Sequence, residues 1–120
     1  AAFVRAFNEG LDNAQAFDTA NTVASGLRVP SAIGDFLILQ SIRDSDGYAL
    51  AVSDDALLGG VTTLGKTEGV FAAPEAGATV AALKKLLKNG QIQKDEQIVL
   101  FITGSGIKYV DVFNSNEKAA

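Results

Sequence analysis

Two apolar runs that do not alternate with polar residues constrain the fold of this chain most strongly. Residues 48–52 read Tyr-Ala-Leu-Ala-Val, and residues 97–103 read Gln-Ile-Val-Leu-Phe-Ile-Thr. A strand with one solvent-exposed face alternates apolar and polar residues, whereas a strand of a parallel sheet is covered on both faces and is apolar throughout. We therefore predict that the two runs are neighbouring buried strands of a parallel sheet.

Helical patterns precede and separate the two predicted strands. Residues 1–10 are expected to end an amphipathic helix at Gly10, and the polar residues 11–21 are expected to form a connection. Pro30 suits the first turn of a helix that runs to about residue 43, because the N–H that proline lacks is not needed there. The apolar face expected on this helix consists of Ile33, Phe36, Leu37 and Ile42.

The next two helical segments differ in their intrinsic helix propensity. A helix that begins with Ser53 or Asp54 as its N-cap has to include Gly59, Gly60 and Gly65. Each interior glycine costs about 1 kcal/mol relative to alanine, so this helix must either be held by tertiary packing or be broken. The packing residues would be Leu57, Leu58, Val61 and Leu64. The clearest helix covers residues 76–89, which carry an apolar stripe and end in lysines.

The order of these elements predicts one α/β domain over residues 1–120, with a partial parallel sheet flanked by helices. A chain of 120 residues is too short for two independent cores. Two strands alone make a marginal sheet, and a parallel sheet needs cover on both faces. We therefore expect the chain to be part of a larger sheet, or to pair with a partner as a homo-oligomer.

Composition excludes several classes of function. The chain has no cysteine and no histidine, which removes thiol nucleophiles, disulfides, the usual zinc sites and Ser-His-Asp triads. A net charge of −4 with few, scattered cations gives no basic face for nucleic acid. No apolar run approaches the ~20 residues that span a bilayer, and no signal-peptide pattern is present, so a soluble, cytoplasmic protein is predicted.

A glycine-rich turn follows the second predicted strand. Thr103 opens the sequence Thr-Gly-Ser-Gly, in which two glycines allow positive φ and a tight exit from a sheet. The carboxyl edge of a parallel strand is also where α/β proteins place ligand-contacting groups, and a threonine hydroxyl can both donate and accept a hydrogen bond there. The local pattern alone leaves a structural strand end and a ligand contact both open.

Three longer segments stand in an informative order along the chain: TVASGLRVPSAIGDFLIL at 22–39, EGVFAAPEAGATVAALKKLL at 68–87 and VLFITGSGIKY at 99–109. Together they resemble the carboxyl-terminal part of the threonine synthases, a family of pyridoxal-phosphate (PLP) enzymes of the tryptophan-synthase-β fold type. The likeness extends over nearly the whole chain. It implies that the predicted sheet is a fragment of the large domain of a fold type II PLP enzyme.

The resemblance implies a cofactor site for PLP. Thr103 stands where the family has the residue that hydrogen-bonds the pyridine nitrogen, and Gly104 lets the backbone pass close to the ring. Glu75 matches a glutamate near the edge of the cofactor, although the amide dipoles also favour an acidic residue at a helix start. Ser25 and Gly26 correspond to a segment that lines one side of the cofactor, and Ser25 is otherwise an ordinary turn residue.

The resemblance also limits what this chain can contribute. The family's cofactor-bearing lysine and its glycine-asparagine phosphate loop lie upstream of the quoted segments, and Lys108 matches neither. The parent reaction converts an amino-acid phosphate, O-phospho-L-homoserine, and water to L-threonine and phosphate. We therefore expect no catalytic residue and no metal ligand here, a need for the amino-terminal portion, and no activity of the isolated chain. A related PLP enzyme (cysteate synthase or an amino-acid ammonia-lyase) and a non-catalytic interaction module remain alternatives.

Overall fold

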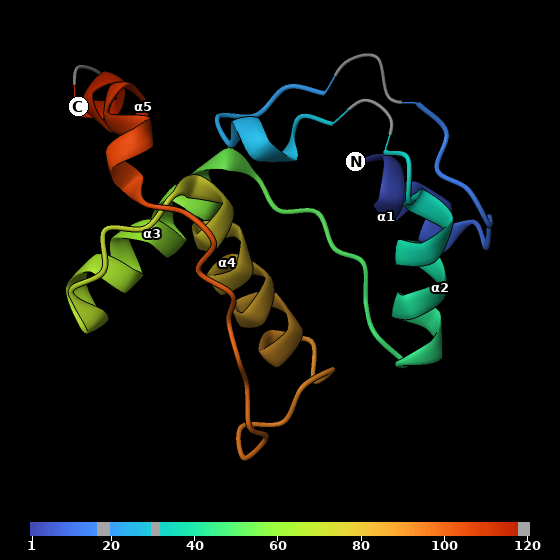
Figure 1. Cartoon of the computed structure of the whole chain (residues 1–120). Helices are drawn as coiled ribbons and strands as arrows, with labels where there is room; N and C mark the ends of the chain where they lie inside the picture. The colour runs from blue at the N-terminus through green and yellow to red at the C-terminus, as the bar shows by residue number, and fades with distance from the viewer. Residues whose placement is uncertain (17–19, 30–31, 118–120) are drawn as a thin grey trace. The chain divides into compact units, whose positions relative to one another are not determined.

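The computed structural model describes residues 1–16, 20–29 and 32–117. It divides into two compact units, the first formed by residues 1–22 and 26–51 and the second by residues 23–25 and 52–120. None of the helices in the described residues is both long enough and apolar enough to cross a membrane. The elements in chain order are α1 (Ala2–Asn8), the 3-10 turn η1 (Ser25–Leu27), α2 (Asp35–Asp44), α3 (Asp54–Glu68), α4 (Pro74–Lys88), the 3-10 turn η2 (Gly106–Tyr109) and α5 (Val110–Glu117) (Figure 1).

In the first unit, polar contacts fasten the chain that follows α1 to both ends of α2. The prediction that the first helix stops near Gly10 is confirmed, and this glycine has a φ of +70°. Asp35 in the first turn of α2 accepts a hydrogen bond from the Ala14 N–H at 2.7 Å. In the last turn, the Arg43 guanidinium donates to the Leu11 carbonyl oxygen at 2.7 Å. The connection after α1 is thereby held at two points.

The apolar face expected on α2 is largely wrong. Leu39 is its fully buried side chain, whereas Phe36 and Leu37 are exposed, as is Ile33 just before the helix. The face that these three residues form has no cover among the described residues of the first unit. The expected start of this helix at Pro30 lies outside the described residues.

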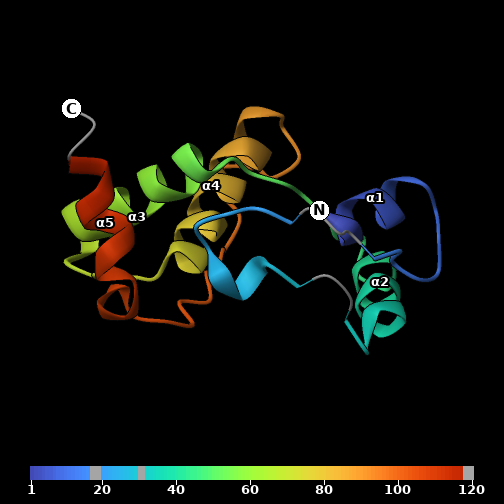
Figure 2. The same cartoon turned by 90° about the horizontal axis from the view of Figure 1, so that it is seen from above.

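In the second unit, α3 is continuous in spite of its three glycines, because it packs closely against α4 (Figures 1 and 2). Of the two predicted N-cap candidates, the structure selects Ser53, whose Oγ accepts a hydrogen bond from the Ala56 N–H at 3.3 Å, while Asp54 is the first residue of the helix. A Cβ atom added to Gly60 would lie well under 3.0 Å from the carbonyl oxygen of Gly77, and one added to Gly77 would lie as close to that of Leu57. The helix backbones thus meet where both lack a side chain.

Apolar side chains from three segments form the core of the second unit. Leu57, Val61 and Leu64 of α3 are buried, as expected from the sequence. Leu64 belongs to a cluster whose other members are Ala72, Ala76 and Val80. Leu100 packs against this cluster, so the segment 97–103 lies along α4 (Figure 1).

The expected parallel sheet is not formed within the described residues. Neither 48–52 nor 97–103 belongs to a strand there. The β-type pairing found in this part of the chain is an isolated antiparallel bridge between Ala72 and Ser105. Although Leu100 is packed, Val99 is 78% exposed and Phe101 is 75% exposed. A strand needs hydrogen-bonding neighbours at its edges, and the described segments supply none to these two runs, so the sheet stays a prediction.

Candidate functional site

The glycine-rich turn docks onto the chain that leads into α4. The Ala73 N–H donates to the Gly104 carbonyl oxygen at 2.9 Å, and the Gly106 N–H donates to the Phe71 carbonyl oxygen at 2.9 Å. A Cβ on Gly104 would lie 3.1 Å from the Ala73 Cβ, and one on Gly106 would lie 2.6 Å from a ring carbon of Phe71. The expectation that these glycines provide positive φ is wrong, because neither has it. Close approach to Phe71 and Ala73 is what requires them.

Thr103 immediately precedes the docked turn, and its side chain is exposed. Its neighbour Gly104 is fixed by the backbone hydrogen bond from Ala73. The chain around Thr103 is therefore anchored while its hydroxyl, which can both donate and accept a hydrogen bond, is accessible. The alternative reading, a residue that only ends a strand, finds no strand at 97–103 in the described structure. A cofactor contact at Thr103 stays a prediction.

Glu75 lies in the first turn of α4, which begins at Pro74, two residues earlier than expected from the sequence. The Tyr109 hydroxyl donates to Glu75 Oε1 at 2.7 Å. Ser25 Oγ lies 2.8 Å from the same hydroxyl oxygen. Because the single Tyr109 proton is directed at Glu75, the Ser25 hydroxyl donates to the Tyr109 oxygen. Ser25, Tyr109 and Glu75 thus form one hydrogen-bonded chain, called here the Tyr109 relay.

The structure brings together several of the predicted site residues. Ser25 and Glu75 meet through Tyr109, and Gly104 is joined to the start of α4. Gly26 is exposed and belongs to the first unit. Sequence reasoning missed Tyr109, because it lies 34 residues from Glu75 and 84 from Ser25 along the chain. Its position at the end of the GSGIKY stretch was the available signal.

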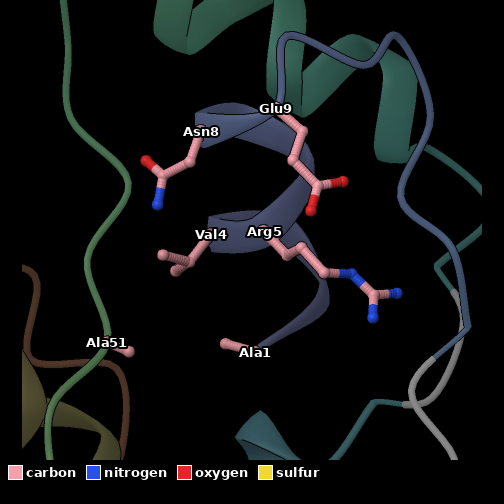
Figure 3. A pocket seen from close by; sticks show the side chains of 6 residues that line it. All are labelled: Ala1, Val4, Arg5, Asn8, Glu9 and Ala51. Carbon is pink, nitrogen blue, oxygen red and sulfur yellow. The ribbon is translucent and has the colours of Figure 1, made fainter.

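A separate shallow hollow lies in the first unit (Figure 3). Figure 3 shows Arg5 and Glu9 on one side of α1, and Val4 and Asn8 on the side toward Ala51. Ala1 completes its lining. No residue predicted from the sequence to contact a cofactor lines this hollow, so the candidate site remains at the start of α4.

Comparison with known proteins assigns the family. A family model described as "Pyridoxal-phosphate dependent enzyme" matches residues 1–104. The chain therefore belongs to the pyridoxal-phosphate dependent enzymes, and PLP is the cofactor of this family.

The curated relatives have a more specific name than the family. The threonine synthase of Methanocaldococcus jannaschii is 34% identical over 108 residues, which make up 90% of this chain and 27% of the relative. The threonine synthase of Bacillus sp. (strain ULM1) is 33% identical over 81% of this chain and 28% of its own length. That of Methanosarcina acetivorans is 32% identical over 88% of this chain and 26% of its own length. The chain thus spans about a quarter of the length of these relatives.

The described residues fit one part of a PLP site. The relay and Thr103 offer hydroxyl and carboxylate oxygens, and the turn that follows Thr103 approaches Phe71, in the chain that leads into α4, so closely that a Cβ on Gly106 has no room. Hydroxyl groups suit a ring nitrogen or a ring substituent, whereas a phosphate needs cations or free backbone N–H groups. None of Ser25, Glu75, Thr103 and Tyr109 has a cationic side chain. By their chemistry these side chains suit the ring side of PLP better than its phosphate.

Proposed function

We propose that these residues form the ring side of the PLP site in a threonine synthase, which converts O-phospho-L-homoserine and water to L-threonine and phosphate. The observation that carries the proposal is the 32–34% identity to proteins of that name over 81–90% of the chain. The anchored turn beside the exposed Thr103 supports it from the structural side.

Each residue of the site would have a limited role. When bound, PLP supplies an electron sink for negative charge that develops on the substrate. Thr103 would hold the pyridine nitrogen through its hydroxyl, and an uncharged hydroxyl leaves that nitrogen largely unprotonated. Gly104 would keep the backbone close to the ring. Glu75 and Ser25 would line the edge and one side of the cofactor.

The remaining parts of the reaction would come from elsewhere in the protein. We propose that the cofactor-bearing lysine, the phosphate anchor and most of the substrate site lie in the portion of the enzyme not represented in this chain. The chain's length, about a quarter of that of its relatives, supports this view. The exposed side chains of Val99 and Phe101 also support it, because they would be covered if 97–103 joined a larger sheet, whether in one subunit or in a homo-oligomer.

The test begins with the DNA upstream of the codon for Ala1, followed by expression of the complete reading frame. With O-phospho-L-homoserine, the protein should release phosphate and form L-threonine in equal amounts, and only when PLP is supplied. The 120-residue chain alone should form neither product. A complete protein that binds PLP but converts another amino acid would instead be a related PLP enzyme. A complete protein that does not bind PLP would refute the proposal and favour an interaction module.

A further inference from the structure

We propose that Tyr109 is a positioning residue of the PLP site, whose hydroxyl holds Ser25 and Glu75 in a fixed arrangement beside the Thr103–Gly106 turn. The inference rests on the proposed function for its cofactor. It goes beyond that function because it gives a role to a residue that the family resemblance does not single out.

The Tyr109 relay joins three segments that are distant in sequence. Tyr109 Oη lies 2.7 Å from Glu75 Oε1 and 2.8 Å from Ser25 Oγ. A phenol that donates to a carboxylate makes a charge-assisted hydrogen bond, which is shorter and stronger than one between neutral groups. Tyr109 and Glu75 are both half-buried, so this bond is partly shielded from competing water. The hydroxyl is therefore well placed to set the position of the Glu75 carboxylate.

The Tyr109 ring is itself carried by an anchored segment. η2, which ends at Tyr109, begins at Gly106, the last residue of the turn that is hydrogen-bonded to Phe71 and Ala73. Ser105 caps η2, since its Oγ accepts a hydrogen bond from the Ile107 N–H at 3.3 Å. A short, capped 3-10 turn leaves little freedom between Thr103 and Tyr109. The position of the Glu75 carboxylate on α4 therefore depends on the position of the turn.

Residues 23–25, which belong to the second unit, are also hydrogen-bonded to the first turn of α3. The Val23 N–H donates to Asp54 Oδ2 at 3.1 Å, which holds the segment two residues before Ser25. The hydrogen bond from Ser25 to Tyr109 acts at the residue that the resemblance places beside the cofactor. Loss of the Tyr109 hydroxyl should therefore free Ser25, while the hydrogen bond between Val23 and Asp54 is kept.

The experiment compares Tyr109→Phe with Tyr48→Phe in the complete protein. Both variants remove one hydroxyl and keep the ring, and Tyr48 is the only other tyrosine of the chain and is 50% exposed. Hydrogen–deuterium exchange is measured without cofactor, and PLP affinity and the absorbance spectrum of the bound cofactor are measured by titration. Tyr109→Phe should exchange about tenfold faster around residues 23–25 and bind PLP about tenfold more weakly with an altered spectrum. Tyr48→Phe should match the wild type in all three.

A purely structural role for Tyr109 makes a different prediction. In that case Tyr109→Phe would lower the melting temperature, while the folded variant would keep the wild-type PLP affinity and spectrum, and the inference would be overturned. If Tyr109→Phe does not fold, Ser25→Ala decides. Faster hydrogen–deuterium exchange of Ser25→Ala around residues 23–25, measured without cofactor, supports the relay, and exchange equal to that of the wild type overturns it. When all variants fold, the double variant Ser25→Ala/Tyr109→Phe should exchange around residues 23–25 no faster than Tyr109→Phe alone, and additive increases in exchange overturn the inference.

The experiment distinguishes a failure of the proposed function from a failure of the positioning role of Tyr109. A wild-type protein that binds no PLP refutes the proposed function irrespective of the variants. The exchange measurement then still tests the relay, because it needs no cofactor. Equal exchange of wild type and Tyr109→Phe around residues 23–25 would overturn the positioning role itself.

Discussion

Two adjacent glycines of α3 should respond in opposite ways to the same substitution. Gly60 is buried, and a Cβ added there would lie 2.9 Å from the carbonyl carbon of Gly77 and closer still to its oxygen. Gly59 is exposed, and a Cβ added there would have no other atom within 4 Å. Both positions are in the helix interior, so Gly59→Ala is a matched control for Gly60→Ala.

The expected magnitudes follow from two opposing effects. Alanine is favoured over glycine in a helix interior by about 0.5–1 kcal/mol, and Gly59→Ala should raise the free energy of unfolding by this amount. At Gly60 the new methyl group meets backbone atoms, which cannot rotate away as a flexible side chain could. The helices must then move apart, and overpacking of this kind typically costs about 1–3 kcal/mol. We expect Gly60→Ala to be about 2 kcal/mol less stable than Gly59→Ala.

Urea unfolding followed by far-ultraviolet circular dichroism measures this difference. Both variants should be made in the complete protein and also in the 120-residue chain, where α3 and α4 are a larger share of the signal. Gly77→Ala, the same change on the opposing helix, should reproduce the loss seen for Gly60→Ala. A Gly60→Ala protein as stable as Gly59→Ala would refute the reasoning, because it would mean that the two backbones are not in contact.

Three further predictions concern the cap of α3, the site and the uncovered apolar segment. Ser53→Ala should lower the free energy of unfolding by about 0.5–2 kcal/mol through loss of the N-cap, measurable by urea unfolding, whereas an unchanged midpoint would contradict the cap. Thr103→Ala should lower kcat/KM for phosphate release from O-phospho-L-homoserine at least about tenfold, while Thr103→Ser, which keeps the hydroxyl, should stay within about threefold of wild type; equal losses would argue against a hydroxyl contact. Amides of residues 98–102 should exchange much more slowly in the complete protein than in the 120-residue chain, and equal rates would show that no sheet forms there.

Local patterns in the sequence predicted the features that depend on neighbouring residues alone. Ser53, one of two candidate caps, caps α3, the first helix stops near Gly10, and Glu75 lies in the first turn of a helix. Caps and stop signals act within one turn of backbone, so a single stretch of sequence contains all the information they need. The resemblance of three colinear segments, in turn, led to the family that comparison confirmed.

Other features depend on where distant segments meet. In the sequence, Gly60 only weakens one helix, and Gly77 is an ordinary residue near the start of another. The structure shows that the two helix backbones touch at these glycines. Tyr109 has no local reason to bond Glu75, 34 residues away. Likewise, the runs 48–52 and 97–103 read as buried strands, yet a strand requires edge partners, and none is present in the described structure. The sequence by itself determined the helix cap, the helix stop and the family. Only the tertiary structure decided which residues meet, because contact between distant segments is a property of the packed chain and not of any stretch within it.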